Sequence, residues 1–280
     1  MGIIEGALRA GELRVSPTAQ LFIAESQADL EAAIAAAVAG NGDVILLPRG
    51  GITVTSTIVV NKSGVRIIAV DDGLNPLARG EFNALLADEA FTDGPVMQVT
   101  APCSLEGIGF VSRDTEATFF GGAALLIGGA APAGAFGVWV KGCRFPKWGL
   151  DNRIGLALAG GAAVADVLIE ECTFEGVGAN FDAGIYAQGA IQNLTIRRNH
   201  FRQCTAAVQF GAFAGGGGPH IFLHENIVED GKLLDTQGNA GDGLIVGNWL
   251  ETATDTASYD RSVSDLKIAG YNFSGNHYSE

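Results

Sequence analysis

Five residues in the C-terminal half have the chemistry of a carbohydrate-binding surface. Tyr186 and Gln188 lie in the segment GIYAQG, Gln209 lies in AVQFG, and Asp235 and Gln237 lie in LLDTQG. If these short apolar segments are neighbouring strands, their outward positions stack Tyr186, Gln209 and Asp235 beside the two other glutamines. An aromatic ring, amides and a carboxylate on one surface can bind a sugar. We favour a solvated strand face here, and sugar contact through these five residues is the functional alternative.

Catalytic residues are less clearly encoded. Asp182 and Asp235 are candidates for the carboxylate pair of a glycoside hydrolase. That chemistry requires roughly 5 to 9.5 Å between the two carboxyl groups, a distance that the sequence does not give. Solvated carboxylates in a turn or on a strand face are the alternative. The catalytic residues therefore stay unassigned.

Metal ligands and cofactor motifs are not evident in the sequence. His220 and His224 are four residues apart, but on a strand this spacing lacks the geometry of helical metal ligands. No CxxC pair occurs among the four cysteines, so a zinc site is not indicated. We predict no metal and no cofactor. The cysteines are Cys103, Cys143, Cys172 and Cys204.

Composition narrows the class of protein. The chain has 280 residues, of which 48% are hydrophobic, so it can bury a sizeable core. Its net charge of −14 opposes binding to nucleic acid through phosphates. No apolar run approaches the roughly 18 residues of a membrane span. The N-terminus lacks the pattern of a secretory signal, which predicts a chain made in a host cytoplasm without a signal peptide.

An eight-residue motif with strand-like alternation recurs along the chain and would position these residues. Its last residue falls at 110, 145, 174, 201, 228, 250 and 273, so the spacings are 35, 29, 27, 27, 22 and 23 residues. Positions one and three are mostly apolar and should face one side. The copies are CSLEGIGF from Cys103, VWVKGCRF from Val138, VLIEECTF from Val167, LTIRRNHF from Leu194, IFLHENIV from Ile221, GLIVGNWL from Gly243 and LKIAGYNF from Leu266.

This period, with two or three short strands and no helix per repeat, fits one coil of a parallel β-helix. Position six then forms a ladder at one corner, where asparagine tolerates left-handed geometry and can bond to the next coil. A disulfide between Cys143 and Cys172 is conceivable, with two small buried thiols as the alternative. The ladder residues are Cys143, Cys172, Asn199, Asn226 and Asn248.

A helix is predicted before the first coil, where it would cover the open end of the core. Ser26 or Asp29 can cap its N-terminus, and Gly40 is predicted to end it. Leu30, Ile34 and Val38 give it one apolar stripe. The expected organisation is an N-terminal arm over 1–25, docking onto a particle, and one β-helix domain over 26–280. That domain comprises the capping helix at 26–40, coils at 43–273 and a C-terminal tail at 274–280.

The start of the chain resembles the pectate-lyase-like right-handed β-helix proteins, which include bacteriophage tailspikes and related virion spikes. The resemblance rests on a helix followed by short strands, and the repeats extend it to about Phe273. It implies an all-β, right-handed parallel β-helix with an N-terminal capping helix. Its segments are Asp29–Ala37, Val44–Gly51, Ile52–Val60 and Gly64–Val70.

The resemblance carries over no catalytic residue. Pectate lyases of this fold use an aspartate cluster for calcium and a basic residue, and polygalacturonases use paired aspartates with His-Gly and Arg-x-Lys elements. Asp71 and Asp72 adjoin each other, but in a turn before Gly73. The sequence contains neither His-Gly nor Arg-x-Lys. We therefore favour a role other than catalysis.

The outward positions of the motif suggest how coils and chains associate. Positions four and five are expected to be exposed and to alternate in charge, which favours strand register. They read Lys141, Glu170, Arg197 and His224, then Gly142, Glu171, Arg198 and Glu225. Position two is mostly apolar, and an apolar outer column usually marks an interface unless loops cover it. It reads Trp139, Leu168, Thr195, Phe222 and Leu244.

These observations predict a structural protein of a bacteriophage virion: a spike, fibre or capsid-decoration protein. We expect a homotrimer joined through Trp139, Leu168, Phe222 and Leu244, with other virion proteins and a host polysaccharide as further partners. The alternative is a polysaccharide lyase or glycoside hydrolase of the pectate-lyase-like fold. A third interpretation is a carbohydrate-binding β-helix without catalysis.

Overall fold

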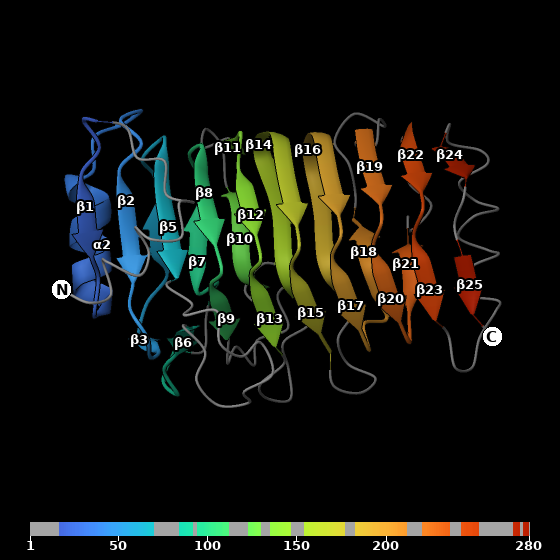
Figure 1. The fold of residues 1–280 in the computed structure, drawn as a ribbon, viewed down its shortest axis with the longest axis horizontal. Coiled ribbons are helices and arrows are strands. Elements are labelled where there is room, and N and C mark those ends of the chain that lie inside the picture. The colour runs from blue at the N-terminus through green and yellow to red at the C-terminus, as the bar shows by residue number, and fades with distance from the viewer. Residues whose placement is uncertain are drawn as a thin grey trace.

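The computed structural model describes residues 17–69, 84–91, 94–111, 123–129, 135–146, 154–176, 183–211, 220–235, 242–251, 271–274 and 277–279. Within them the chain coils through three ladders of parallel strands, stacked along one axis (Figure 1). The predicted parallel β-helix is therefore confirmed. Residues 1–16 of the predicted arm at 1–25 lie outside the described residues, as do Asp182, Gln237 and the Asp71–Asp72 turn.

Each coil visits the ladders in the same order. The first ladder comprises β4 (Ile58–Val60), β7 (Met97–Val99), β10 (Ala123–Gly129), the first parts of β14 (Ile154–Glu170) and β16 (Ala183–Arg197), β18 (Ala206–Phe210) and β21 (Lys232–Asp235). The second ladder comprises β1 (Leu21–Ile23), β2 (Val44–Leu47), β5 (Val65–Ala69), β8 (Cys103–Glu106), β12 (Trp139–Lys141), the later parts of β14 and β16, β19 (His220–His224), β22 (Asp242–Val246) and β24 (Tyr271–Ser274). The two-residue strand β11 (Ala135–Phe136) also pairs with β14.

The third ladder is a separate sheet. It comprises β3 (Ile52–Val54), β6 (Ala84–Ala87), β9 (Gly109–Val111), β13 (Arg144–Pro146), β15 (Thr173–Glu175), β17 (His200–Arg202), β20 (Ile227–Glu229), β23 (Trp249–Glu251) and β25 (His277–Ser279). In the coils of the repeat motif, positions one to four lie on the second ladder and positions seven and eight on the third.

The core lies inside the coil, where positions one, three and eight meet. As predicted, the residues at positions one and three are buried in copy after copy, including Val167, Ile169, Leu194 and Ile196. Position eight forms a stack of parallel rings, with centroids 5.3 Å apart for Phe110 and Phe145, 4.6 Å for Phe145 and Phe174, and 4.8 Å for Phe174 and Phe201. No single coil can bury these side chains, so stacking supplies the hydrophobic stabilisation.

The last predicted copy of the motif was misplaced. Gly243 pairs with Tyr271, and Trp249 pairs with His277, so the final copy is YNFSGNHY from Tyr271 rather than LKIAGYNF from Leu266. The tail predicted at 274–280 accordingly contains β25. The segment from Leu266 shows the same apolar alternation, and only strand pairing distinguishes the two registers.

Helix α2 (Gln27–Ala36) covers the N-terminal end of the stack, as predicted (Figure 1). The Ser26 hydroxyl accepts a hydrogen bond from the Asp29 backbone N–H at 3.2 Å, so Ser26 is the N-cap. The predicted C-terminus was wrong, because the helix ends at Ala36 and not at Gly40. Val38 therefore lies beyond the helix and is exposed instead of extending the apolar stripe.

Asp43 joins the helix to the first strands. Its buried carboxylate accepts hydrogen bonds from the backbone N–H groups of Gln20 at 2.7 Å and Val38 at 2.8 Å, and from Asn41 Nδ2 at 2.6 Å. The two backbone donors lower the pKa of Asp43. Strand β1, which pairs with β2 within the segment predicted as an arm, is thereby fixed to the rest of the fold.

The predicted corner ladder is confirmed in the described residues. Asn199, Asn226 and Asn248 are buried, and each side-chain oxygen accepts a hydrogen bond from a backbone N–H of the preceding coil at 2.9–3.0 Å. Each amide nitrogen donates to the carbonyl at position three of the preceding coil at 3.0 Å. This ladder satisfies buried backbone groups at every turn of the corner.

Cysteine replaces asparagine in two coils of the same ladder. The Cys143 Sγ lies 3.5 Å from the carbonyl oxygens of Leu105 and Lys141. The Cys172 Sγ lies 3.2 Å from the Glu170 carbonyl oxygen and 3.6 Å from that of Val140. Both thiols are free and buried, which favours the alternative to a disulfide. Burial raises the pKa of Cys172, so the thiol is the stable form.

Position five, and not position six as predicted, has the left-handed backbone of this corner. Its φ is +59° at Gly142, +56° at Glu171, +54° at Arg198, +57° at Glu225 and +66° at Gly247. The reason is that position six must point its side chain into the coil to form the ladder. The turn therefore falls on the residue before it.

Substitutions at position five should change stability through the backbone alone. A Cβ atom on Gly142 would meet nothing within 4 Å, yet Gly142→Ala should lower the free energy of unfolding by about 1 kcal/mol because an L-residue is strained there. Glu225→Gly should raise it by roughly 0.5 to 1 kcal/mol by relieving the same strain. Chemical denaturation followed by circular dichroism measures both. If both substitutions raised the free energy of unfolding, or both lowered it, the explanation would be contradicted.

Candidate functional site

The predicted carbohydrate surface lies on the outer side of the first ladder. Tyr186, Gln209 and Asp235 occupy one column in register, as expected. However, Tyr186 is only 5% exposed, and its hydroxyl donates to Gln188 Oε1 at 3.1 Å. The expectation of a solvent-facing aromatic ring was therefore wrong, because Tyr186 packs in a small cluster with Leu126, Ala157 and other apolar residues. Sugar contact through Gln188, Gln209 and Asp235 stays a prediction.

The other candidate chemistries find little support in the described residues. The distance between Asp182 and Asp235 is not defined, since Asp182 lies outside these residues. No group of three or more histidine, cysteine or acidic side chains in the described part could hold a metal ion. His224 pairs in register with Arg197. Burial, followed by the charges of Arg197 and Arg198, lowers the pKa of His224 against the opposing effect of Glu225.

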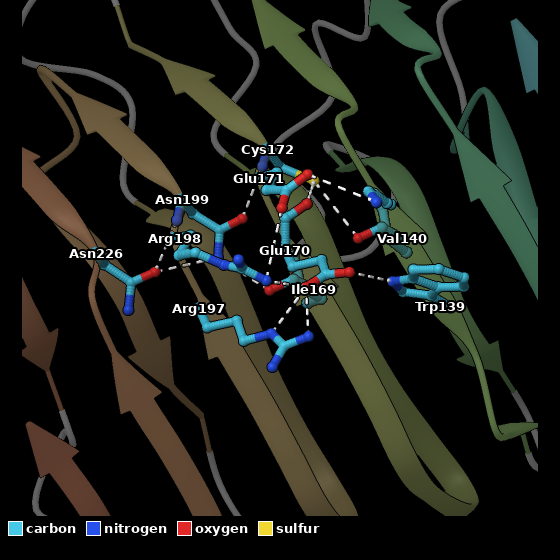
Figure 2. A network of polar contacts seen from close by, with 11 residues as sticks. Trp139, Val140, Ile169, Glu170, Glu171, Cys172, Arg197, Arg198, Asn199 and Asn226 are labelled. Atoms are coloured by element: carbon cyan, nitrogen blue, oxygen red, sulfur yellow. Dashed lines mark hydrogen bonds and ion pairs between the residues drawn. The ribbon is translucent and has the colours of Figure 1, made fainter. Parts of the chain in front are cut away.

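Glu170, at position four of its coil, is bonded by three side chains from two neighbouring coils (Figure 2). Its Oε1 accepts a hydrogen bond from Trp139 Nε1 at 3.0 Å. Its Oε2 accepts from Arg197 Nε at 2.7 Å and from an Arg198 guanidinium nitrogen at 2.9 Å. The prediction that position four is exposed was wrong here, because Glu170 is 3% exposed beneath these three side chains.

The charge of Glu170 is stabilised by its partners. Burial by itself would raise the pKa of this carboxyl group, but the hydrogen bonds and charge of Arg197, the hydrogen bond of Arg198 and that of Trp139 together hold it below the ordinary value. Glu170 is thus a structural anion rather than a proton donor at neutral pH.

Charged side chains elsewhere on the second and third ladders pair between neighbouring coils. Distances between charged atoms are 2.9 Å for Arg66–Glu106, 3.7 Å for Lys141–Glu171, 3.5 Å for Arg198–Glu171, 3.0 Å for Arg202–Glu229 and 3.6 Å for Arg202–Glu175. The His200 ring Nε2 also lies 2.7 Å from a Glu229 carboxylate oxygen. These contacts fit the interpretation of alternating charges as register devices.

The predicted apolar column is present on the outer side of the second ladder. Trp139, Leu168, Thr195, Phe222 and Leu244 pair in register from coil to coil. Lys141 Nζ lies 5.4 Å from the Trp139 ring centroid, and Trp139 and Leu168 are only partly exposed. Phe222 is 43% and Leu244 37% exposed. We call Phe222 and Leu244 the second-ladder patch, since the exposed part of the column is confined to them.

A further apolar pair was missed by the sequence analysis. Ile227 and Trp249 pair in register on the third ladder and are 43% and 48% exposed. We call them the third-ladder patch. The available signal was position seven of the motif, which is polar in the copies from Val138, Val167 and Leu194 and apolar in the two that follow.

Comparison with known proteins supports the architecture. The family model described as a right-handed beta helix region matches residues 131–279. A PL6-family alginate lyase superposes with a TM-score of 0.59 at 12% identity, over 95% of this chain and 41% of that one. A DFA-IIIase from Arthrobacter chlorophenolicus A6 gives 0.52 at 12% identity, over 90% and 71%. The ORF18 protein of Geobacillus virus E2 gives 0.47 at 13% identity, over 90% and 57%.

These similarities concern the fold, because the identities are low. The chain spans less than half the length of the alginate lyase that it matches. No curated protein matches the sequence. Among the described residues, no helix is long and apolar enough to cross a membrane.

Proposed function

We propose that this chain, which belongs to the right-handed β-helix family, is a structural protein of a bacteriophage virion that assembles as a homotrimer. In our proposal the chain forms a spike, a fibre or a capsid-decoration protein. Its partners are then two further copies of the chain and other virion proteins. We propose a host polysaccharide as a further partner, bound at Gln188, Gln209 and Asp235.

The second-ladder patch is the observation that carries this proposal. Phe222 and Leu244 are large apolar side chains, adjacent on paired strands, and more than a third of each is exposed. Neighbouring apolar side chains on the outside of a sheet favour association with another surface. Within the described residues, Glu170 pairs with Arg197 and Arg198, and Glu229 pairs with Arg202, contacts that fit a structural role for these charged side chains.

Solution mass tests the proposal. Light scattering should give about three times the chain mass of 28.9 kDa, and Phe222→Glu should reduce it to one chain because burying the new carboxylate in the interface is costly. Val59→Glu is a matched control, since Val59 is 42% exposed but lies on β4 of the first ladder. A monomeric wild-type chain, or equal effects of the two variants, would contradict the proposal.

The alternative function, a polysaccharide lyase or hydrolase, has one supporting observation. Gln188, Gln209 and Asp235 are partly exposed on adjacent strands and could contact a glycan. A monomer that depolymerises a polysaccharide and loses this activity in Asp235→Asn would favour the enzyme over the virion protein.

A further inference from the structure

The sequence contains a single Asn-Gly pair, formed by Asn41 and Gly42 in the loop between α2 and β2. In such a pair the backbone nitrogen of the glycine can attack the side-chain carbon Cγ of the asparagine, because glycine has no side chain to obstruct the approach. The side-chain nitrogen leaves as ammonia and a succinimide ring forms. Water then opens the ring to aspartate or isoaspartate, so the net reaction consumes one water and releases one ammonia.

The surroundings of Asn41 favour this attack. Gly42 has a φ of +77°, and its N–H makes no hydrogen bond within the described residues, so no other partner holds the attacking nitrogen. The Thr18 hydroxyl donates a hydrogen bond to Asn41 Oδ1 at 2.8 Å. Negative charge develops on this oxygen when Cγ becomes tetrahedral, and a donor in place stabilises that charge. Thr18 is exposed and Asn41 is partly exposed, so water can reach the ring.

Asn41 also takes part in the contacts that hold β1. Its Nδ2 donates to the Thr18 carbonyl at 2.8 Å and to Asp43 Oδ1 at 2.6 Å. The same Asp43 oxygen accepts a hydrogen bond from the Gln20 backbone N–H, directly before β1. Deamidation replaces the Asn41 donor with a carboxylate, which would face two acceptors, one of them the buried Asp43 carboxylate. Like charges this close repel, and a buried charge cannot recover its hydration, so these contacts are lost.

We propose that Asn41 is a site of spontaneous deamidation, and that its product loosens the hold of Asp43 on β1. Within the described residues β2 is the only strand that pairs with β1, over three residues, so the Asp43 contact is a substantial part of its attachment. The reaction is irreversible and its only co-reactant is water. It therefore acts as a slow, one-way loosening of the N-terminal end of the β-helix.

Peptide mass spectrometry tests the modification itself. Protein would be kept in mildly alkaline buffer, folded or in urea, until the sample in urea is fully converted. We expect the peptide containing Asn41 to change from amide to acid in the folded sample as well, and to become a substrate for isoaspartyl methyltransferase. Asn61, which is exposed and followed by Lys62, should stay unmodified as an internal control. A folded protein that keeps the Asn41 amide would overturn the assignment.

The Thr18 hydroxyl can be tested separately. Thr18→Val removes the donor to Oδ1 but keeps the carbonyl that accepts from Nδ2. Deamidation should become several-fold slower in the folded variant, with no change in urea, where the contact does not exist. Equal rates for the folded wild type and folded Thr18→Val would show that the folded structure does not promote the reaction.

Asn41→Asp introduces the charge of the product directly and tests the effect on β1. The backbone N–H groups of Gln20 and Ala24, which donate to Asp43 and to the Leu46 carbonyl, should exchange with solvent several-fold faster. The Asn226 backbone N–H should keep its wild-type rate, because it lies far along the stack. Asn61→Asp is the matched control. Equal exchange at Gln20 and Ala24 in the two variants would overturn the loosening of β1, and neither outcome depends on how many chains assemble.

Discussion

Asn226→Ala should lower the free energy of unfolding by about 3 kcal/mol, because it leaves buried backbone groups without partners. The Asn226 side chain is fully buried. Its oxygen accepts from the Asn199 backbone N–H at 3.0 Å, and its nitrogen donates to the Ile196 carbonyl at 3.0 Å. Alanine replaces neither contact. Each abandoned group costs roughly 1 to 3 kcal/mol.

The ladder itself provides a graded comparison. Asn226→Cys should lose less stability than Asn226→Ala, because Cys143 and Cys172 place a thiol sulfur 3.5–3.6 Å from the position-three carbonyl, within reach of a weak hydrogen bond. The cysteine sulfur is a weaker acceptor than the Asn226 amide oxygen. The free energy of unfolding of Asn226→Cys should therefore lie between those of the wild type and Asn226→Ala. Equilibrium denaturation at one fixed protein concentration measures all variants. Gln192→Ala, at an exposed site of β16, is the control, and an Asn226→Ala loss no larger than that of the control would contradict the explanation.

The coil itself could be predicted because its determinants are local. Alternation at positions one and three fixed which side chains point inward, and Asn199, Asn226 and Asn248 fixed the spacing of one corner. The same local signal failed near the C-terminus, where Leu266 and Tyr271 both begin alternating segments. Only the pairing of β24 with β22 selects Tyr271, and pairing is a property of two coils rather than of one.

The site predictions failed where burial depends on residues one coil away. Glu170 was expected on the surface because position four lies near the corner of the coil, but Trp139, Arg197 and Arg198 cover it from the coils on either side. Tyr186 was placed outward correctly, yet it packs against outward residues of earlier coils, including Ala157. Sequence alternation gives the direction of a side chain but not what lies over it.

Glu170→Gln should lower the free energy of unfolding at neutral pH by about 2 to 3 kcal/mol, since removing one member of a buried ion pair leaves its partners uncompensated. Arg197 and Arg198 are 35% and 45% exposed, so they can partly recover hydration, which places the loss below that of a fully buried pair. Glu171→Gln is the matched control. The Glu171 carboxylate is 41% exposed and lies 3.5 Å from Arg198 and 3.7 Å from Lys141. Exposed ion pairs of this kind are worth less than about 1 kcal/mol.

The pH dependence of the same variant separates charge from packing. The pKa of Glu170 is lower in the folded protein than its ordinary value of 4.5, so the unfolded chain binds more protons as the pH falls through that range. Its stabilisation is complete above about pH 4.5 to 5 and is lost as the pH drops through the folded pKa. Denaturation of wild type and Glu170→Gln from pH 7 to 3 should therefore show a difference that shrinks with acid. A difference that stays constant over this range would assign the effect to packing around the side chain and not to its charge.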